Sequence, residues 1–373
     1  MKVIAQLKLI PTSEQVTALQ QTREQANAAC NEISRVAWEQ QTFGTFALHA
    51  LVYARIRAEY GLGAQLAIRC LAKVGDSYTV ARQRQRTYAK HGAIAFDDRI
   101  LSFKLTRQTV SLWTVQGRFN DITFLCCERQ KHLLQSRQGQ SDLVYRKGCF
   151  YLLVTCNVDV PPPAEVDDAL GVDLGIVNLA TDSDGESYSG AQVEQTRQRY
   201  AKRRSALQSV GTKSAKRRLK QISGRQRRFQ ANTNHVISKQ LVAKAKGTVR
   251  GLALEDLTRL RERVTVRHAQ RARHHNWAFG QLRSFVQYKA ALAGVPVVVV
   301  DPRDTSRTCS VCGGCDKRNR VSQALFRCRS CGHAAPADVN AALNIAYRAV
   351  PASGNPMLPM VSDLRVQGQA ALL

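Results

Sequence analysis

The sequence predicts a chain of the α/β class built from two parts. Apolar side chains recur at helical spacing over residues 11–92, whereas short apolar segments separated by turns dominate residues 93–163. Three prolines, Pro161 to Pro163, then form a natural linker, and apolar strands alternate with helical segments beyond it. A chain of 373 residues can hold two or three domains with a substantial buried core.

The N-terminal part begins with an alternating strand, and Thr12 or Ser13 is placed to cap the helix that follows. The expected elements are a strand over 1–10, a helix over 13–40, helices over 47–90 broken at 61–63 and near Gly75-Asp76, and strands over 100–103, 108–115, 122–124, 143–145 and 150–158. The first strand is expected to join the later ones. Residues 1–10 and 93–163 would then form one β domain, with residues 11–92 as a helical insertion.

The C-terminal part begins at Ala169 with an apolar run that reads as a buried strand. The expected elements are strands over 170–174, 177–181 and 186–189, helices over 197–246 broken at Gly211, a strand over 251–254 ending at Glu255, a helix over 276–291, a strand over 297–300 and a helix over 337–348. This is the order of an RNase H-like α/β fold. We assign it to residues 164–305 and 333–350, and we expect a loose tail over 351–373.

Two cysteine pairs interrupt that fold. Cys309 and Cys312 are followed after fifteen residues by Cys328 and Cys331, and two such CxxC pairs are typical of a closed, four-thiolate structural zinc site. We therefore predict a zinc ribbon over 306–332. Cys315 forms a further CxxC with Cys312, so it is an alternative ligand. We prefer Cys309 and Cys312, because the two glycines after Cys312 supply the tight turn of a zinc knuckle.

Three acidic residues fall at positions that meet in an RNase H-like fold. Asp173 lies within the first strand, Glu255 ends the fourth strand, and Asp338 opens the last helix. A buried carboxylate is costly unless it is paired, and three together repel one another, which a divalent cation relieves. Mg²⁺ prefers oxygen ligands, with Mn²⁺ as the alternative, and two such ions can cleave a phosphodiester bond. Asp256, Asp301 and Asp304 are the acids that could substitute in a different geometry.

The charge of the chain indicates a polyanionic partner. Lys and Arg total 55 against 28 Asp and Glu, for a formal net charge of +27, and residues 196–254 contain no acid. Nucleic acid is the usual partner of such a chain, and an anionic membrane is the alternative. No apolar run approaches the roughly 18–20 residues that span a bilayer, and the N-terminus lacks a signal peptide's apolar core. We expect a protein of the prokaryotic cytoplasm that is nucleoid-associated when it binds DNA.

These residues together resemble the TnpB family, the RNA-guided nucleases of bacterial insertion sequences, which is similar to the compact type V CRISPR effectors. The resemblance covers roughly the C-terminal half. It rests on Gly171–Thr181, Leu254–Leu257, Asn276–Phe279, Tyr288–Ala290 with Gly294, Thr305–Gly313, Phe326–Gly332 and Asp338–Ile345. The N-terminal half resembles the family in its layout only.

The resemblance implies a RuvC-like nuclease domain with Asp173, Glu255 and Asp338 as catalytic, magnesium-binding acids. It also implies a β-barrel-like wedge domain and a helical recognition domain in the N-terminal half. The implied partners are a guide RNA from the protein's own locus and double-stranded target DNA with a short flanking motif, and a monomer is favoured. Phosphate contacts are expected from Arg203, Arg204, Arg217, Arg218, Arg227, Arg228, Arg271 and Arg273.

Other function classes stay open at this level. The chain could be a non-cleaving, RNA-guided DNA-binding regulator or an accessory transposition protein, although the intact acids disfavour this. It could also be a metal-dependent nuclease that acts on structured DNA without RNA. A DDE-type transposase is disfavoured, because its last acid does not usually follow a zinc ribbon directly.

Overall fold

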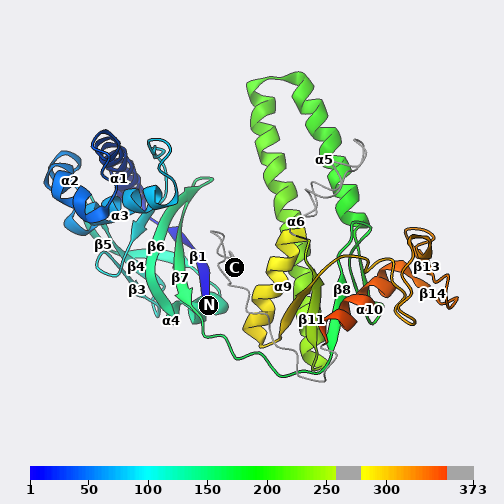
Figure 1. Cartoon of the computed structure of the whole chain (residues 1–373). Helices are drawn as coiled ribbons and strands as arrows, with labels where there is room; N and C mark the ends of the chain where they lie inside the picture. The colour runs from blue at the N-terminus through cyan, green and yellow to red at the C-terminus, as the bar shows by residue number, and fades with distance from the viewer. Residues whose placement is uncertain (258–278, 351–373) are drawn as a thin grey trace. The chain divides into compact units, whose positions relative to one another are not determined.

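The computed structural model describes residues 1–257 and 279–350. The chain divides into two compact units, and the boundary between them lies at Asp159 and Val160 (Figure 1). Each unit combines helices with a β-sheet, which confirms the mixed α/β class. No helix in the described ranges is long and apolar enough to cross a membrane.

The first unit contains a seven-stranded, barrel-like antiparallel sheet of order β2-β6-β7-β1-β5-β4-β3. Its strands are β1 (Lys2–Ile10), β2 (Ile94–Phe96), β3 (Leu101–Lys104), β4 (Thr109–Thr114), β5 (Gly117–Leu125), β6 (Arg137–Arg146) and β7 (Cys149–Asn157). The N-terminal strand β1 lies in the middle, with Val3 opposite Cys156 and Lys8 opposite Leu125. The prediction that the first strand joins the later ones is confirmed. Strand β2 and the short helix α4 (Glu128–Gln135) were not predicted.

Three helices, α1 (Ser13–Glu39), α2 (Thr45–Tyr60) and α3 (Ala64–Val80), are inserted between β1 and β2. Thr12 caps α1 in a capping box with Gln15, and Gly61 ends α2 in the left-handed conformation at φ 59°, as expected. The predicted break near Gly75 is wrong. Helix α3 continues through this residue because Gly75 serves packing: an added Cβ would lie 2.4 Å from Thr45 Oγ1.

The second unit contains a five-stranded sheet of order β10-β9-β8-β11-β12. Its strands are β8 (Ala169–Asp173), β9 (Asn178–Asp182), β10 (Ser187–Ser189), β11 (Gly251–Glu255) and β12 (Val297–Val300). β11 pairs parallel with both β8 and β12, whereas β9 and β10 form an antiparallel hairpin around Gly185. The predicted order of strands and helices in this unit is confirmed.

Helices cover both faces of this sheet. α6 (Lys213–Gly247) and α9 (Phe279–Ala293) pack on the face that carries Leu170, Val172 and Leu254. α10 (Ala337–Ala349) packs on the other face, against small residues such as Ala169 and Ala253. The predicted start of the α9 helix at Asn276 lies outside the described residues, as does the predicted tail over 351–373.

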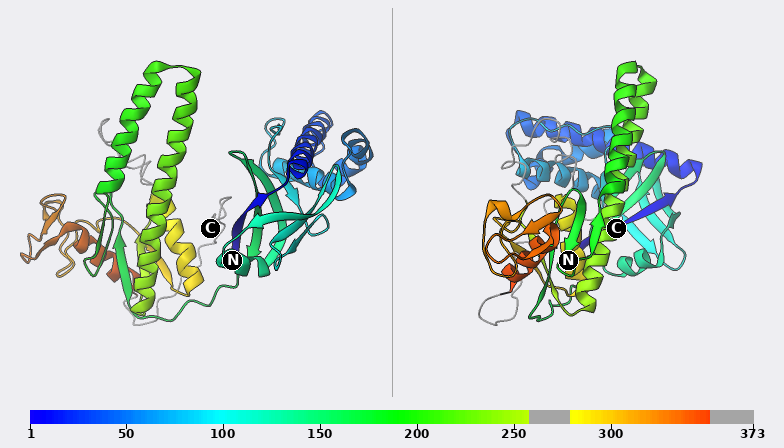
Figure 2. Two further views of the ribbon diagram at one scale, coloured as in Figure 1. Left: turned by 180° about the vertical axis from the view of Figure 1, so that it is seen from behind. Right: turned by 90° about the vertical axis from the view of Figure 1, so that its right-hand side faces the viewer.

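α5 (Ala191–Val210) and α6 form a long antiparallel hairpin, which we name the basic arm (Figure 2). The arm turns at Gly211, which has φ 67°, at the predicted break. Its inner end is anchored to the β9–β10 hairpin, because Lys244 donates to the buried carboxylate of Asp182 at 2.5 Å. Arg250 also forms a two-bond pair with Asp184, at 2.6 and 2.8 Å.

Candidate functional site

The sheet of the second unit brings two of the three predicted acids to one edge. Asp173 ends β8 and Glu255 ends β11, and Leu254 pairs with Val172 one step before each strand finishes. Because the two strands are parallel, their carboxyl ends lie side by side. Glu255 is 7 % exposed, so its carboxylate is largely removed from water.

Helix α10 brings the third acid to the same place. Asp338 lies in its first turn, and the helix crosses β8 at Gly171. A Cβ atom at Gly171 would lie 2.0 Å from the carbonyl oxygen of Ala342 and 2.6 Å from the nitrogen of Ala346. Only glycine therefore lets the helix backbone approach the strand this closely, and that approach fixes the position of Asp338.

The electrostatics show that Glu255 and Asp338 both act on Asp173. Burial, together with the neighbouring carboxylates of Glu255 and Asp338, raises the pKa of Asp173 to about 8, against the opposing charge of Arg320. Burial also raises the pKa of Glu255, although a hydrogen bond from Thr305 opposes this. A buried carboxyl group with a raised pKa, such as that of Asp173, can release its proton when a cation binds beside it.

Polar neighbours form hydrogen bonds with the carboxylates of Asp338 and Glu255. Asn178, the first residue of β9, donates to Asp338 Oδ2 at 3.0 Å, and Arg320 donates to Asp338 Oδ1 at 3.3 Å. The Thr305 hydroxyl donates to Glu255 Oε1. None of these three contacts was predicted, because each joins residues that are distant in the sequence.

The alternative acids are engaged elsewhere. Asp256 pairs with Arg283 at 2.6 Å, and Asp301 accepts a hydrogen bond from the backbone of Arg303. Asp304 has a positive φ of 61° and forms an exposed pair with Arg307. No carboxylate of these three appears among the groups that shift the pKa of Asp173, although Asp301 contributes to the raised pKa of Glu255.

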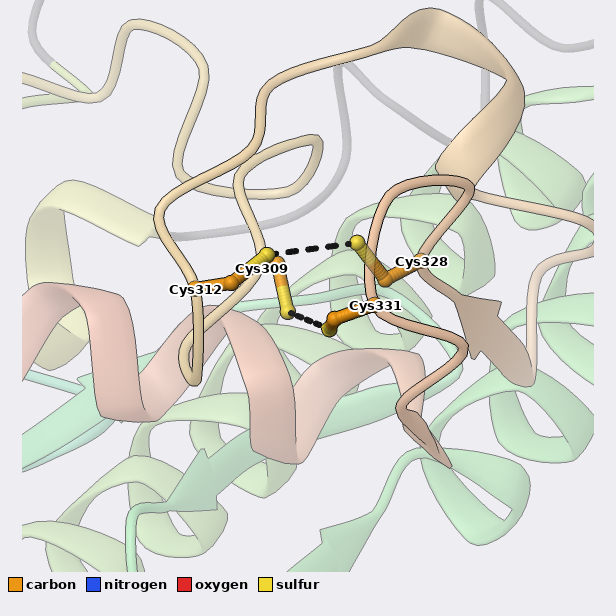
Figure 3. Close-up of side chains that lie close together, drawn as sticks. All are labelled: Cys309, Cys312, Cys328 and Cys331. Carbon is orange, nitrogen blue, oxygen red and sulfur yellow. Dashed lines mark hydrogen bonds between the residues drawn. The ribbon is translucent and has the colours of Figure 1, made fainter.

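The four predicted zinc ligands form a compact cluster. The Sγ atoms of Cys309, Cys312, Cys328 and Cys331 all lie within 4.8 Å of one another, which no other described set of three or more possible metal ligands does. The Sγ atoms of Cys309 and Cys331 are 3.7 Å apart, and those of Cys312 and Cys328 are 3.5 Å apart (Figure 3). Tetrahedral zinc with bonds of about 2.3 Å places its sulfurs about 3.8 Å apart, so the cluster fits a structural zinc ion.

Local backbone geometry favours the thiolate form of Cys328 and shapes the cluster. Backbone N–H groups, led by that of Cys331, lower the pKa of Cys328 to about 6. Gly313 and Gly332 follow the two CxxC pairs with φ of 72° and 76°, in the left-handed region that tight knuckles need. Cys315 lies outside the cluster and is exposed, in line with the preferred ligand set.

Helix α10 ties the ribbon to the acidic site. Asn344 donates to the carbonyl oxygens of Thr305 at 2.9 Å and Thr308 at 2.7 Å. Asn340 donates to Thr308 at 2.8 Å and accepts from the backbone of Ser310 at 3.0 Å. The segment that enters the ribbon is therefore fixed to the helix that carries Asp338.

The basic arm carries six of the eight arginines predicted to contact nucleic acid. Arg204 donates to Gln226 and Arg218 to Gln221, and the other four, Arg203, Arg217, Arg227 and Arg228, are exposed. Within the described part of the chain, none of the six forms an ion pair. Arg271 and Arg273 lie outside the described residues.

Comparison with known proteins gives two matches to protein families. Residues 152–261 match the OrfB_IS605 family, whose description is "Probable transposase". Residues 279–345 match the family described as "Cas12f1-like, TNB domain". The second match contains the four-cysteine cluster and Asp338.

Two named relatives each align with more than half of this chain. The CRISPR-associated endodeoxyribonuclease Cas12f1 of Sulfoacidibacillus thermotolerans is 34% identical over 221 residues, which cover 54% of this chain and 50% of the relative. The chain thus aligns with half of that relative's length. The TnpB-like protein MJ0751 of Methanocaldococcus jannaschii is 25% identical over 259 residues, which cover 65% of this chain and 91% of the relative.

Among solved structures, the "Cryo-EM structure of the Cas12f1-sgRNA-target DNA complex" has a TM-score of 0.40 and 16% identity, covering 93% of this chain and 99% of that chain. A TM-score of this size does not by itself define a fold. The family matches and the named relatives agree with one another. The chain belongs to the TnpB/OrfB family and carries a Cas12f-like TNB domain.

Proposed function

We propose that this protein is a transposon-associated, RNA-guided DNA endonuclease that cleaves target DNA by metal-dependent phosphodiester hydrolysis. The observation that carries the proposal is the convergence of Asp173, Glu255 and Asp338 from two parallel strands and a helix, where burial and the neighbouring carboxylates raise the pKa of Asp173. The names of the relatives, an endodeoxyribonuclease and a TnpB-like protein, support the same chemistry.

In this proposal the second unit is an RNase H-like (RuvC) nuclease domain. Mg²⁺ held by the carboxylates would activate a water molecule and stabilise the leaving oxygen. Oxygen ligands of this kind suit Mg²⁺. We propose a site for two ions, for which Asp173, Glu255 and Asp338 would supply the oxygen ligands.

The surrounding residues orient that site. Asn178 and Arg320 hold one carboxylate oxygen each of Asp338, and Thr305 holds Glu255. Arg320 acts as a positioning residue that supplies positive charge to the three acids before a metal binds. The ribbon, closed by a structural zinc ion, would fix the loop that carries Arg320.

The remaining parts of the chain have proposed roles in holding nucleic acid. Residues 1–10 and 93–163 would form the wedge domain, 11–92 the recognition domain, 164–305 and 333–350 the nuclease domain, and 306–332 the ribbon. The exposed arginines of the basic arm would bind phosphates of a guide RNA paired with target DNA, whose sequence is read by base pairing. A short flanking motif on the DNA would be read by the first unit.

The test is plasmid cleavage by protein co-expressed with RNA from its own locus, with Mg²⁺ or with EDTA. Asp173→Asn removes the negative charge but keeps the shape of the side chain, and Asp167→Asn, an exposed acid just before β8, is the matched control. We expect guide-directed cleavage by the wild-type and Asp167→Asn proteins, and none in EDTA or with Asp173→Asn. If the locus RNA and target bind but Mg²⁺ never supports cleavage, the nuclease assignment is wrong and the chain is a guided DNA-binding regulator.

A further inference from the structure

An open cavity of 530 Å³ lies in the first unit. One wall is a stripe of α1 that includes Asn31, Glu32 and Arg35. Tyr60 at the end of α2 forms a second wall, and Gln85, Thr87 and Tyr88 form a third. The volume falls in the range of roughly 300–1,000 Å³ that is usual for sites of small organic ligands.

The third wall belongs to an irregular segment, residues 81–93, which we name the strap. Four side chains on one face of α1 hold its backbone. Asn31 donates to the Tyr88 carbonyl at 2.9 Å and accepts from the Tyr88 N–H at 2.7 Å, and Ser34 donates to the Arg86 carbonyl at 2.7 Å. Further along, Asn27 and Arg23 donate to the Gly92 carbonyl, at 3.1 and 3.4 Å.

These side chains are spaced so that they follow one face of the helix, and most of them are removed from water. Arg23, Asn27 and Ser34 are each at most 1 % exposed. The Tyr88 hydroxyl is also within 2.8 Å of Ser77 on α3. The hydrogen bonds from α1 hold the backbone of the strap in place, so the strap forms a fixed wall of the cavity. The cavity is therefore pre-formed, which lowers the entropic cost of binding.

The charged groups of the cavity neutralise one another. Arg35 donates two hydrogen bonds to Glu32, at 2.7 and 2.9 Å, and two more to Glu39 at 2.7 Å. Arg55 also donates to Glu32 at 2.7 Å. These bonds lie along the edge of the Arg35 guanidinium, and the Arg35 side chain is still 46% exposed. In a chain of net charge +27, this site is unusual because it offers little to attract a phosphate.

The cavity also contains two neutral polar groups that can form hydrogen bonds with a ligand, the Gln85 amide and the Tyr60 hydroxyl. Gln85 is exposed, and neither its amide nor the Tyr60 hydroxyl has a hydrogen bond to any described residue. Burial raises the pKa of Tyr60, with the charge of Glu32 acting in the same direction, so its hydroxyl stays protonated and can donate. A glutamine amide is both donor and acceptor, which is the pattern that matches N6 and N7 of adenine.

We propose that this cavity binds an unstacked nucleobase, with adenine preferred, from the nucleic acid that the protein handles. Unstacked bases are recognised by stacking on aromatic rings or arginine planes and by hydrogen bonds to their edges. Tyr60 and the face of Arg35 supply the planar surfaces here, and Gln85 supplies the edge contact. The inference rests on the proposed function in that it takes the ligand to be part of a nucleic acid.

The test uses nucleosides, which carry no phosphate and so do not respond to the positive charge of the chain. Saturation-transfer NMR would compare adenosine, 2′-deoxyadenosine, guanosine and cytidine on the full-length protein. We expect adenine nucleosides to bind in the millimolar range and the others several-fold more weakly. A preference for adenosine or for 2′-deoxyadenosine distinguishes a base of RNA from a base of DNA, and either result supports the site.

Variants then assign the binding to the cavity. Gln85→Ala, or the isosteric Gln85→Glu, should weaken adenosine binding five- to tenfold, the size expected for one or two lost hydrogen bonds. Tyr60→Phe should weaken it two- to fivefold. Gln83→Ala changes an exposed glutamine two residues away, outside the cavity, and should leave binding unchanged. An unchanged melting temperature would show that each variant is folded.

The inference is overturned if no nucleoside binds in this range, or if the Gln85 variants bind adenosine as the wild type does. These outcomes are separate from those of the plasmid experiment, because nucleoside binding needs no guide RNA, metal or catalytic acid. Cleavage without nucleoside binding would remove the base site alone. Nucleoside binding without cleavage would keep the base site and remove the nuclease assignment.

Discussion

Arg320, which lies between the two CxxC pairs, donates a hydrogen bond to the carboxylate of Asp338 on α10, 3.3 Å away. Its positive charge also lowers the pKa of Asp173 against the effect of burial. A guanidinium on Asp338 competes with a metal ion for the same oxygen. We therefore expect Arg320→Gln to lower the Mg²⁺ concentration needed for half-maximal plasmid cleavage several-fold. The maximal rate of cleavage should fall at least tenfold, because Asp338 loses the hydrogen bond from Arg320 that positions it.

The matched control is Arg318→Gln, since Arg318 lies in the same ribbon but pairs with Asp316. It should change neither the Mg²⁺ dependence nor the rate. An Arg320→Gln protein whose Mg²⁺ titration coincides with that of the wild type would show that Arg320 does not compete with metal at Asp338.

Zinc content is the measurement for the four-thiol cluster. We expect one zinc per chain by elemental analysis, and we expect Cys328→Ser to lose most of it, because a closed tetrahedral site has no spare protein ligand. Loss of zinc should also abolish cleavage, since the ribbon is fixed to α10 through Asn340 and Asn344.

Cys315→Ser serves as the control because Cys315 lies outside the cluster. This variant should keep both zinc and activity. If Cys315→Ser lost zinc while Cys312→Ser kept it, the ligand set would have to be reassigned.

Much of the second unit was predictable from sequence because its signals are local. Asp173 and Glu255 lie within or at the end of apolar runs that can only be buried strands, and Gly211 marks the tip of the basic arm. Errors arose where packing decides the outcome. Gly75 is a turn signal in sequence, yet α3 passes through it, and β2 is only three residues long.

The candidate site was predictable in its acids and thiols but not in their partners. A carboxylate is rarely found in an apolar strand, and cysteines rarely recur in CxxC pairs, unless they bind a metal. These residue types therefore indicate a metal site from the sequence alone. Asn178, Thr305 and Arg320 are ordinary surface residue types in sequence. Their roles arise only from tertiary contacts with Asp338 and Glu255.

The close approach of α10 to β8 predicts a large effect from a single methyl group. Gly171→Ala would place a Cβ 2.0 Å from the Ala342 carbonyl oxygen, and backbone atoms cannot rotate away. We expect a loss of about 3 kcal/mol or more in the free energy of unfolding, at or above the upper end of overpacking effects. Gly247→Ala meets no atom within 4 Å at the end of α6, and chemical denaturation should show it as neutral or slightly stabilised. Equal stabilities of the two variants would contradict the observed packing.

The ion pair that anchors the basic arm predicts a pH dependence of stability. Hydrogen bonds from Arg250 lower the pKa of Asp184 to about 2 from its ordinary value near 4. A carboxyl group with a lowered pKa in the folded state stabilises the fold above its unfolded pKa, and this contribution is lost as pH falls toward 2. Asp184→Asn should therefore lower the melting temperature at pH 5–7, and the difference from wild type should shrink as pH falls below about 4. A difference that stayed constant over this range would show that the charge of Asp184 is not the cause.

The charge of the basic arm predicts how the affinity for nucleic acid depends on salt. Arg217 and Arg218 have no ion pair within the described ranges and lie near the tip of the arm. If each contacts one phosphate, the double variant Arg217→Gln and Arg218→Gln should reduce the slope of log affinity against log salt by about 2, since each lost contact to a duplex removes about 0.9. Arg197→Gln, on the same hairpin, is the control, because Arg197 is already paired with Glu194 at 2.7 Å. Binding of the locus RNA measured over a range of salt concentrations should show a steeper slope for this control than for the double variant. Identical slopes for the wild type, the double variant and Arg197→Gln would show that Arg217 and Arg218 face solvent. Phosphate binding would then lie elsewhere on the chain.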